Sequence, residues 1–155
     1  KLDDALAVSI HLNSLSDKNA NGTLSIYYAP SKESKQMAEI LSKNVSEALG
    51  VKNKGILPDT QTYTGSLGWL RRTKMRSALV EVCFISNEAD MKILTALGGY
   101  KKAAVGLRNG LCEVLGVKTI DTTTSKYTLL KNEILEIIKK LNELLQRLNE
   151  IINSR

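Results

Sequence analysis

The sequence of 155 residues has few of the residue types that build metal clusters, disulfide frameworks and base-stacking surfaces. It contains one histidine, two cysteines and only 5% aromatic residues. The cysteines, Cys83 and Cys112, lack the spacing of zinc ligands and lie in apolar segments, where we expect them to be small buried hydrophobic residues. Two such cysteines define no disulfide framework, so they do not indicate whether the protein resides in an oxidising or a reducing compartment. No apolar run approaches the length that crosses a bilayer, so we expect no membrane span.

The chain also lacks a balance of charge. Its formal net charge is +6 and its sequence pI is about 9.3. A basic protein suits an anionic partner, such as nucleic acid, a membrane surface or an acidic wall polymer. The lysines and arginines are scattered, however, and no aromatic residues are interleaved with them. We therefore expect no nucleic-acid partner, and a solvated basic surface is the simpler explanation of the charge.

Length suggests one domain, or one domain with an appendage. Apolar residues make up 43% of the chain, which is enough for a core. The chain starts without Met and reaches an apolar strand within about five residues, so we expect further sequence upstream of Lys1. We expect three parts: a folded domain over 1–117, a polar Thr-rich linker over 118–128, and a helix over 129–155.

The pattern of apolar and turn-forming residues predicts alternating strands and helices in the first part. We expect strands at 6–11, 23–28 and 78–86, helices at 31–50, 87–99 and 100–115, and a loop over 51–64. The third strand, "ALVEVCFIS", is almost continuously apolar, as a central strand buried on both faces would be.

The tail has the apolar spacing of a coiled-coil helix. Apolar side chains recur at steps of four and three, and a second column widens the stripe on one flank. The seam comprises Leu130, Ile134, Ile138, Leu141, Leu145, Leu148 and Ile152, and the flank comprises Ile137, Leu144 and Ile151. Such a helix must pack on its own domain, on a partner helix or on a neighbouring copy. We expect self-association or a helix partner through 129–155.

Two polar residues stand out in the apolar strands, His11 and Glu81. A lone histidine is more often a structural group than a ligand, and a buried carboxylate is costly unless it has a partner or a function. Arg71 or Lys74 could form a salt bridge with Glu81. Alternatively, an imidazole can bind zinc while a nearby carboxylate takes a proton from water. One His and one Glu do not complete such a site, because catalytic zinc normally has three protein ligands.

Several blocks occur in an order that resembles one enzyme family. They are "ALAVSIHLNS", "GTLSIYYAPSKESKQMAEIL", "LGVKNKGI", "LGWLRRTKMRSALVEVCFISNEADMKIL" and "YKKAAVGLRNGLCEVLG". Together they resemble the zinc-dependent N-acetylmuramoyl-L-alanine amidases, which are peptidoglycan hydrolases of bacterial autolysins, sporulation enzymes and phage endolysins. The resemblance covers about 2–117, and "SIHLN" and "LVEVCFISN" are its most specific parts.

The resemblance implies an α/β fold with a mixed, mostly parallel sheet flanked by helices, here followed by the coiled-coil-like helix. It implies hydrolysis of the amide between N-acetylmuramic acid and the L-alanine of the stem peptide, with zinc as cofactor and peptidoglycan as partner. His11 matches a zinc ligand and Glu81 matches the catalytic glutamate, a general base toward a zinc-activated water. Arg71 and Asn13 are candidate substrate-binding residues. The expected location is the bacterial cell wall or exterior, or a phage-encoded protein released at lysis.

The chain departs from the family pattern at several points. A Gly-His-Gly turn and a following zinc-binding Glu are absent, and both would lie upstream of Lys1. Cys83 replaces a usual glycine and Arg76 a common proline. The chain is therefore the C-terminal part of a longer enzyme, a half that pairs with the missing half, or inactive. The alternative function is a non-catalytic scaffold, or a fragment that oligomerises or binds the wall.

Overall fold

The computed structural model describes residues 5–119 and 126–153, and in the last helix it describes the side chains of 130–150. The chain divides into two compact units, Lys1–Thr119 and Ile120–Arg155. Each unit is described by itself below. The expected linker falls largely on 120–125, outside the described residues.

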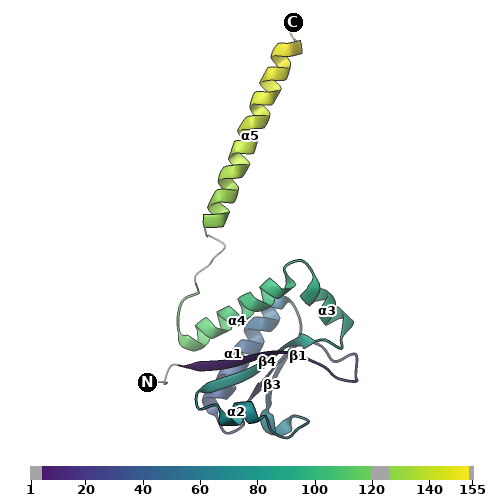
Figure 1. The fold of residues 1–155 in the computed structure, drawn as a ribbon, viewed down its shortest axis with the longest axis vertical. Coiled ribbons are helices and arrows are strands. Elements are labelled where there is room, and N and C mark those ends of the chain that lie inside the picture. The colour runs from purple at the N-terminus through teal and green to yellow at the C-terminus, as the bar shows by residue number, and fades with distance from the viewer. Residues whose placement is uncertain (1–4, 120–125, 154–155) are drawn as a thin grey trace. The chain divides into compact units, whose positions relative to one another are not determined.

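The first unit is built on a four-stranded sheet with strand order β1-β4-β2-β3 (Figure 1). The strands are β1 (Leu6–Asn13), β2 (Thr23–Tyr27), β3 (Asn53–Pro58) and β4 (Arg76–Phe84). β1 pairs with β4 in parallel and β2 pairs with β3 in parallel, whereas β2 and β4 are antiparallel. The predicted mixed, mostly parallel α/β sheet is confirmed.

β4 is the central strand, as its apolar sequence predicts, because it pairs with β1 on one side and β2 on the other. Only its first residue and Glu81 are not fully buried. β1 differs from the expectation of a buried strand. Among the described residues it pairs with β4 alone, and its second half is exposed, with Ile10 60% and Leu12 39% accessible.

β3 was expected to be a loop and is a strand. Its sequence, "NKGILP", has a glycine with φ of +85° and a proline at its end, both of which argue against a strand. Within the part of the chain that the structure describes it pairs with β2 alone, and polar contacts hold it there. The hydroxyl of Ser42 donates to the Gly55 carbonyl at 2.9 Å and the Asn53 side-chain oxygen at 2.8 Å. Hydrogen bonds from a neighbouring helix thus replace the apolar alternation that identifies most strands.

Helices α1 (Lys32–Leu49) and α4 (Gly99–Leu115) cover one face of the sheet (Figure 1). The hydroxyl of Ser31 caps α1 by accepting from the Ser34 N–H, and Gly50 ends it in a left-handed conformation. α4 lies very close to α1. A Cβ at Gly106 would stand 2.7 Å from the Asn44 carbonyl oxygen, so only glycine fits at this contact.

The opposite face of the sheet is covered only in part. The short helix α2 (Gly68–Arg72) places Leu70, which is fully buried, against Ile26 of β2 and Leu79 of β4. A 3₁₀ turn, η1 (Asp59–Gln61), follows β3, and α3 (Glu88–Thr95) follows β4. The strand positions beyond Leu79 on this face include Glu81, so this residue lies on the more open side of the sheet.

The second unit consists of one helix, α5 (Lys126–Asn153), which begins three residues earlier than expected. The expected C-terminal helix is confirmed. Ile151 and Ile152 of the predicted stripe have side chains outside the described set. Among the described residues, no helix has both the length and the apolar character needed to span a membrane.

Candidate active site

His11 and Glu81 are direct neighbours across the parallel pair of β1 and β4. Paired residues on adjacent strands are about 4.8 Å apart along the hydrogen-bonding direction and point to the same face. Leu24 of β2 pairs with Glu81 on its other side. An imidazole, a carboxylate and an aliphatic side chain therefore follow one another across three strands. Residues 70 positions apart in the sequence are brought together in this way.

Glu81 carries a buried carboxylate oxygen that the fold leaves unsatisfied. Its Oε2 atom has no hydrogen-bond partner among the described residues. Burial raises the pKa of Glu81 above its usual value, and the charge of His11 opposes this only in part. The alternative of a salt bridge to Arg71 is wrong, because Arg71 pairs with another carboxylate. An unpartnered buried carboxylate with a raised pKa makes Glu81 a candidate functional residue.

His11 lies within β1, two residues before its end, and not at the strand exit where the sequence placed it. It is exposed. Its Nε2 atom lies 2.7 Å from the hydroxyl of Ser9, which is two residues earlier in β1 and on the same face of the strand. This contact fixes the orientation of the ring. The imidazole is thus exposed to solvent beside Glu81, on the same face of the sheet.

Asn13 shapes the chain where β1 ends. Its side-chain oxygen accepts the Ser14 N–H at 2.8 Å, and its carbonyl accepts the Ile85 N–H at 2.8 Å. The register shifts between His11 and Asn13. Asn13 is thus occupied with the turn and the irregularity that follow His11, and any contact with substrate would be additional to this role.

Arg71 is held by a fully buried aspartate. Its Nε atom donates to Asp59 Oδ2 at 2.7 Å, and the Ala29 N–H donates to the other carboxylate oxygen at 3.0 Å. Burial would raise the pKa of Asp59, but the hydrogen bonds from Ala29, Arg71 and Leu67 outweigh it and lower that pKa. The Arg71 side chain is 40% exposed. Asp59, which the sequence analysis did not single out, therefore orients an arginine that still reaches solvent.

Asp90 and Asn87 hold the ends of the strands beside the candidate site. Asp90 Oδ2 accepts the N–H groups of Gly22 at 2.8 Å and Phe84 at 2.9 Å. Asn87 caps α3 through the Asp90 N–H and donates to the Lys18 carbonyl at 2.7 Å. The spacing Asn-x-x-Asp after β4 was a visible signal for the cap, but the contacts with the loop before β2 could not be predicted from it.

A family model described as N-acetylmuramoyl-L-alanine amidase matches residues 1–113. The chain belongs to this amidase family. It is 32% identical over 114 residues to a protein of Bacillus anthracis described as an uncharacterized cell wall amidase, covering 68% of this chain and 20% of the relative. It is 29% identical over 107 residues to the N-acetylmuramoyl-L-alanine amidase LytC of Bacillus subtilis (strain 168), with the same coverage, 68% and 20%.

Solved structures of amidases have the same fold. The catalytic domain of CwlV, an N-acetylmuramoyl-L-alanine amidase from Bacillus (Paenibacillus) polymyxa var. colistinus, superimposes with a TM-score of 0.62 at 31% identity. The match covers 73% of this chain and 59% of CwlV. The chain thus spans about three fifths of a solved amidase catalytic domain and a fifth of the longer relatives.

The donor set of this amidase chain is incomplete for zinc. Within 5–119 and 130–150, no three His, Cys, Asp or Glu side chains are grouped so that they could hold a metal ion. His11 offers one nitrogen, and the carboxylate of Glu81 lies beside it. Catalytic zinc takes three protein ligands. The described residues therefore fit one edge of a zinc site and do not form a whole one.

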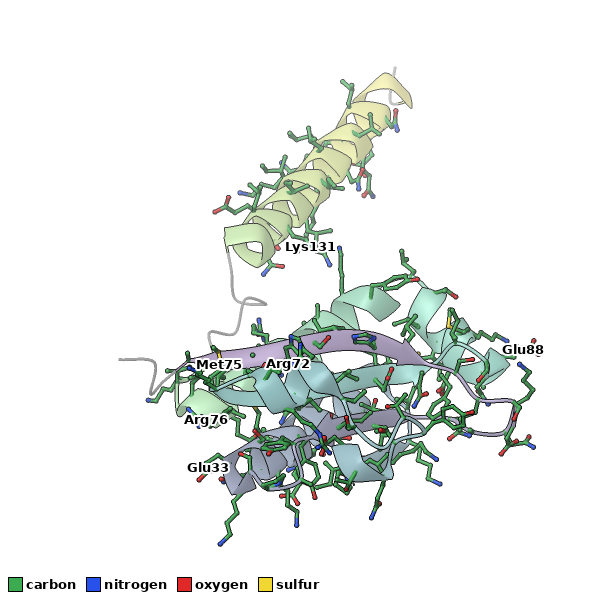
Figure 2. All side chains as sticks on the ribbon, turned by 60° about the horizontal axis from the view of Figure 1, so that its bottom comes forward. Glu33, Arg72, Met75, Arg76, Glu88 and Lys131 are labelled. Atoms are coloured by element: carbon green, nitrogen blue, oxygen red, sulfur yellow. The ribbon has the colours of Figure 1, made fainter. Side chains whose placement is uncertain are left out.

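Two further features of this amidase unit are set apart from the pair of His11 and Glu81. Burial, with a smaller effect of the Asp90 carboxylate, raises the pKa of the Cys83 thiol to about 11, so the thiol is not an activated nucleophile. At the amino-terminal end of β4, Glu33, Met75 and Arg76 border a hollow of about 480 Å³ (Figure 2). Glu81 lies in the carboxyl-terminal half of β4, with His11 beside it on β1, so this hollow is a separate region.

Proposed function

We propose that this chain forms part of a peptidoglycan amidase that hydrolyses the bond between N-acetylmuramic acid and the L-alanine of the stem peptide. The observation that carries the proposal is the cross-strand pair of His11 and Glu81, with the buried and unsatisfied Oε2 of Glu81. Family membership supports the reaction class. The location that follows is the cell wall or the exterior of a bacterium.

Glu81 is proposed as the general base. The pKa of Glu81 is raised toward the pH at which the enzyme operates. A carboxyl group with such a pKa can both accept and release a proton during the reaction. Glu81 would take a proton from the attacking water at Oε2 and then give it to the leaving amine nitrogen of L-alanine. Bound zinc would supply Lewis acidity toward the scissile carbonyl and lower the pKa of water. His11 is proposed to be one of the zinc ligands.

The proposal requires further zinc ligands from protein outside the described residues. The outer edge of β1 is where a segment that carries them would best fit. Beside it lies an apolar hollow of about 300 Å³, which Ile10, Leu12 and Tyr100 help to line. A strand added there would bring its side chains next to His11 on the same face.

Arg71 is proposed to bind the substrate, because Asp59 fixes one edge of its guanidinium while the side chain stays partly exposed. Arginine held in this way suits the carboxylates of a stem peptide. Asn13 is proposed as a second contact at the end of β1.

The test is amide hydrolysis by the longest natural protein that contains these residues. The measurement is the release of new L-alanine amino termini from purified peptidoglycan, together with zinc content. His11→Ala is expected to lose zinc and activity, and Glu81→Gln to keep zinc and lose activity by about 10²-fold or more. Glu47→Gln, an exposed residue on α1, is the matched control and keeps both.

The second candidate is a non-catalytic wall-binding or scaffolding role, which the incomplete donor set favours. A protein that binds peptidoglycan, holds no zinc and releases no new amino termini would establish that role and contradict the amidase proposal. Full zinc in His11→Ala would remove this residue from the metal site.

A further inference from the structure

Helix α5 exposes an apolar surface that a helix cannot keep in water by itself. Nine of its large apolar side chains are between 48% and 60% exposed. They are Leu130, Ile134, Leu135, Ile137, Ile138, Leu141, Leu144, Leu145 and Leu148. Apolar surfaces of this extent mark contacts with another macromolecule.

All of these side chains except Leu135 form one continuous stripe. At 3.6 residues per turn they fall within about 120° of the helix circumference. The central column is formed by Ile134, Leu141 and Leu148, which are spaced seven residues apart. One flanking column contains Ile137 and Leu144.

The opposite flank contains Ile138 and Leu145, again seven residues apart. The stripe therefore has three apolar columns per heptad. A two-stranded coiled coil buries two columns and leaves the third at its solvent-exposed rim. Three columns are the pattern of helices that face the core of a larger bundle, where each helix contacts two neighbours.

We propose that α5 joins copies of this chain into a bundle of at least three helices. The polar face of the helix indicates that the occupants are identical copies. Within 130–150 it carries four basic and four acidic residues. The basic residues are Lys131, Lys139, Lys140 and Arg147, and the acidic residues are Glu133, Glu136, Glu143 and Glu150.

The balance of these charges excludes a strong preference for a polyanionic surface. A helix that lies on an anionic membrane has a predominantly basic polar face. Here the net charge of the segment is zero, so identical helices pack without net repulsion. Glu136 and Lys140 stand four residues apart, as do Glu143 and Arg147, and both pairs have the favourable order for stabilising a water-facing helix surface.

The first test is the solution mass of the full chain, measured by sedimentation equilibrium at tens of micromolar. We expect at least three times the chain mass of 17.1 kDa. Leu141→Lys places a charge in the central column and is expected to return the mass to that of one chain. Gln146→Lys places the same charge on the polar face and is the matched control, which keeps the mass of the assembly.

A second variant tests the width of the stripe. Ile137→Glu with Leu144→Glu removes one flanking column and leaves the two columns Ile138/Leu145 and Ile134/Leu141/Leu148, and two columns are what a two-stranded coiled coil buries. We expect this variant to have twice the chain mass. A mass of one or two chains for the unaltered protein would overturn the proposal. A mass of one chain would show that α5 packs on its own chain or requires a different partner. An unchanged mass for Leu141→Lys would place the association in the other unit and overturn it as well.

Discussion

At the scale of single residues, Glu81 lowers the free energy of unfolding at neutral pH. The folded state raises its pKa, so folding favours the protonated carboxyl. The contribution of Glu81 to the free energy of unfolding is favourable below the pKa that this residue has in the unfolded chain. It is lost as the pH rises through the pKa that Glu81 has in the folded chain. Deprotonation leaves a charge whose Oε2 atom has no partner among the described residues. A buried carboxylate with this cost is consistent with the general base proposed above.

Glu81→Gln is therefore expected to raise the free energy of unfolding of the metal-free chain at pH 7. The amide stays neutral at every pH, so the gain disappears at pH values below about 4, where the carboxyl is also neutral. Chemical denaturation at pH 7 and at pH 3.5 measures both. Glu47→Gln, at an exposed position, controls for the change of residue type. A destabilised Glu81→Gln at pH 7 would indicate a structural ion pair and contradict this interpretation.

The candidate site could be predicted from the sequence only where a residue breaks a pattern. His11 and Glu81 interrupt apolar strands, so their positions were visible, but their pairing across β1 and β4 was not predicted from the sequence. Asp59 and Asp90 were not found as site-supporting residues, because a carboxylate in a loop or a first helical turn is ordinary. Their partners, Ala29 and Gly22, are distant in the sequence. Contacts of this kind depend on tertiary structure.

At the scale of elements, the contact between α1 and α4 depends on glycine. Gly106→Ala is expected to lower the free energy of unfolding by about 1–3 kcal/mol, because the new Cβ would lie 2.7 Å from the Val45 Cα and Asn44 carbonyl oxygen. The higher helix propensity of alanine offsets only part of this. Thermal and urea denaturation measure the change.

Gly68→Ala is the control for this prediction, because a Cβ at Gly68 meets nothing within 4 Å. It is expected to leave the stability within about 0.5 kcal/mol of the unaltered chain, as surface substitutions usually do. Equal stability of Gly106→Ala and Gly68→Ala would show that α4 can move away from α1 without cost.

The elements themselves were predictable in proportion to their apolar periodicity. β4 and α1 have strong patterns and both were predicted. β3 has a weak pattern and was missed, since Ser42 of α1 holds it through polar contacts. β1 was assigned correctly, but its burial was not, because the number of neighbours of a strand is a property of the sheet and not of the strand.

At the scale of the whole molecule, the excess of basic charge belongs to the amidase unit. Residues 1–119 hold 16 Lys and Arg against 11 Asp and Glu, a net charge of +5 of the total of +6. This unit is therefore expected to approach anionic wall polymers by electrostatic attraction, which salt screens.

Binding to purified, anionic cell wall is expected to weaken several-fold as NaCl rises from 0.05 to 0.5 M, because the screening length shortens from well above 10 Å to only a few Å. Lys101→Gln with Lys102→Gln, exposed on α4, should reduce both the binding and its salt dependence. Pull-down with wall fragments at graded salt measures this. Salt-independent binding would show that recognition is not electrostatic.

The order of strands in the sheet determines when β1 can find its partner during synthesis. β4 is the last strand to be synthesised, yet it is the one that joins β1 to β2 and β3. Among the described strands β1 pairs with β4 alone, and some 70 residues separate the paired positions His11 and Glu81. β1 therefore has no strand partner until Phe84, at the end of β4, has left the ribosome. Loop closure over such a separation is slow, and unpaired strand edges associate with one another in the meantime. The pairing that brings His11 beside Glu81 therefore cannot form in a nascent chain before β4 has been synthesised.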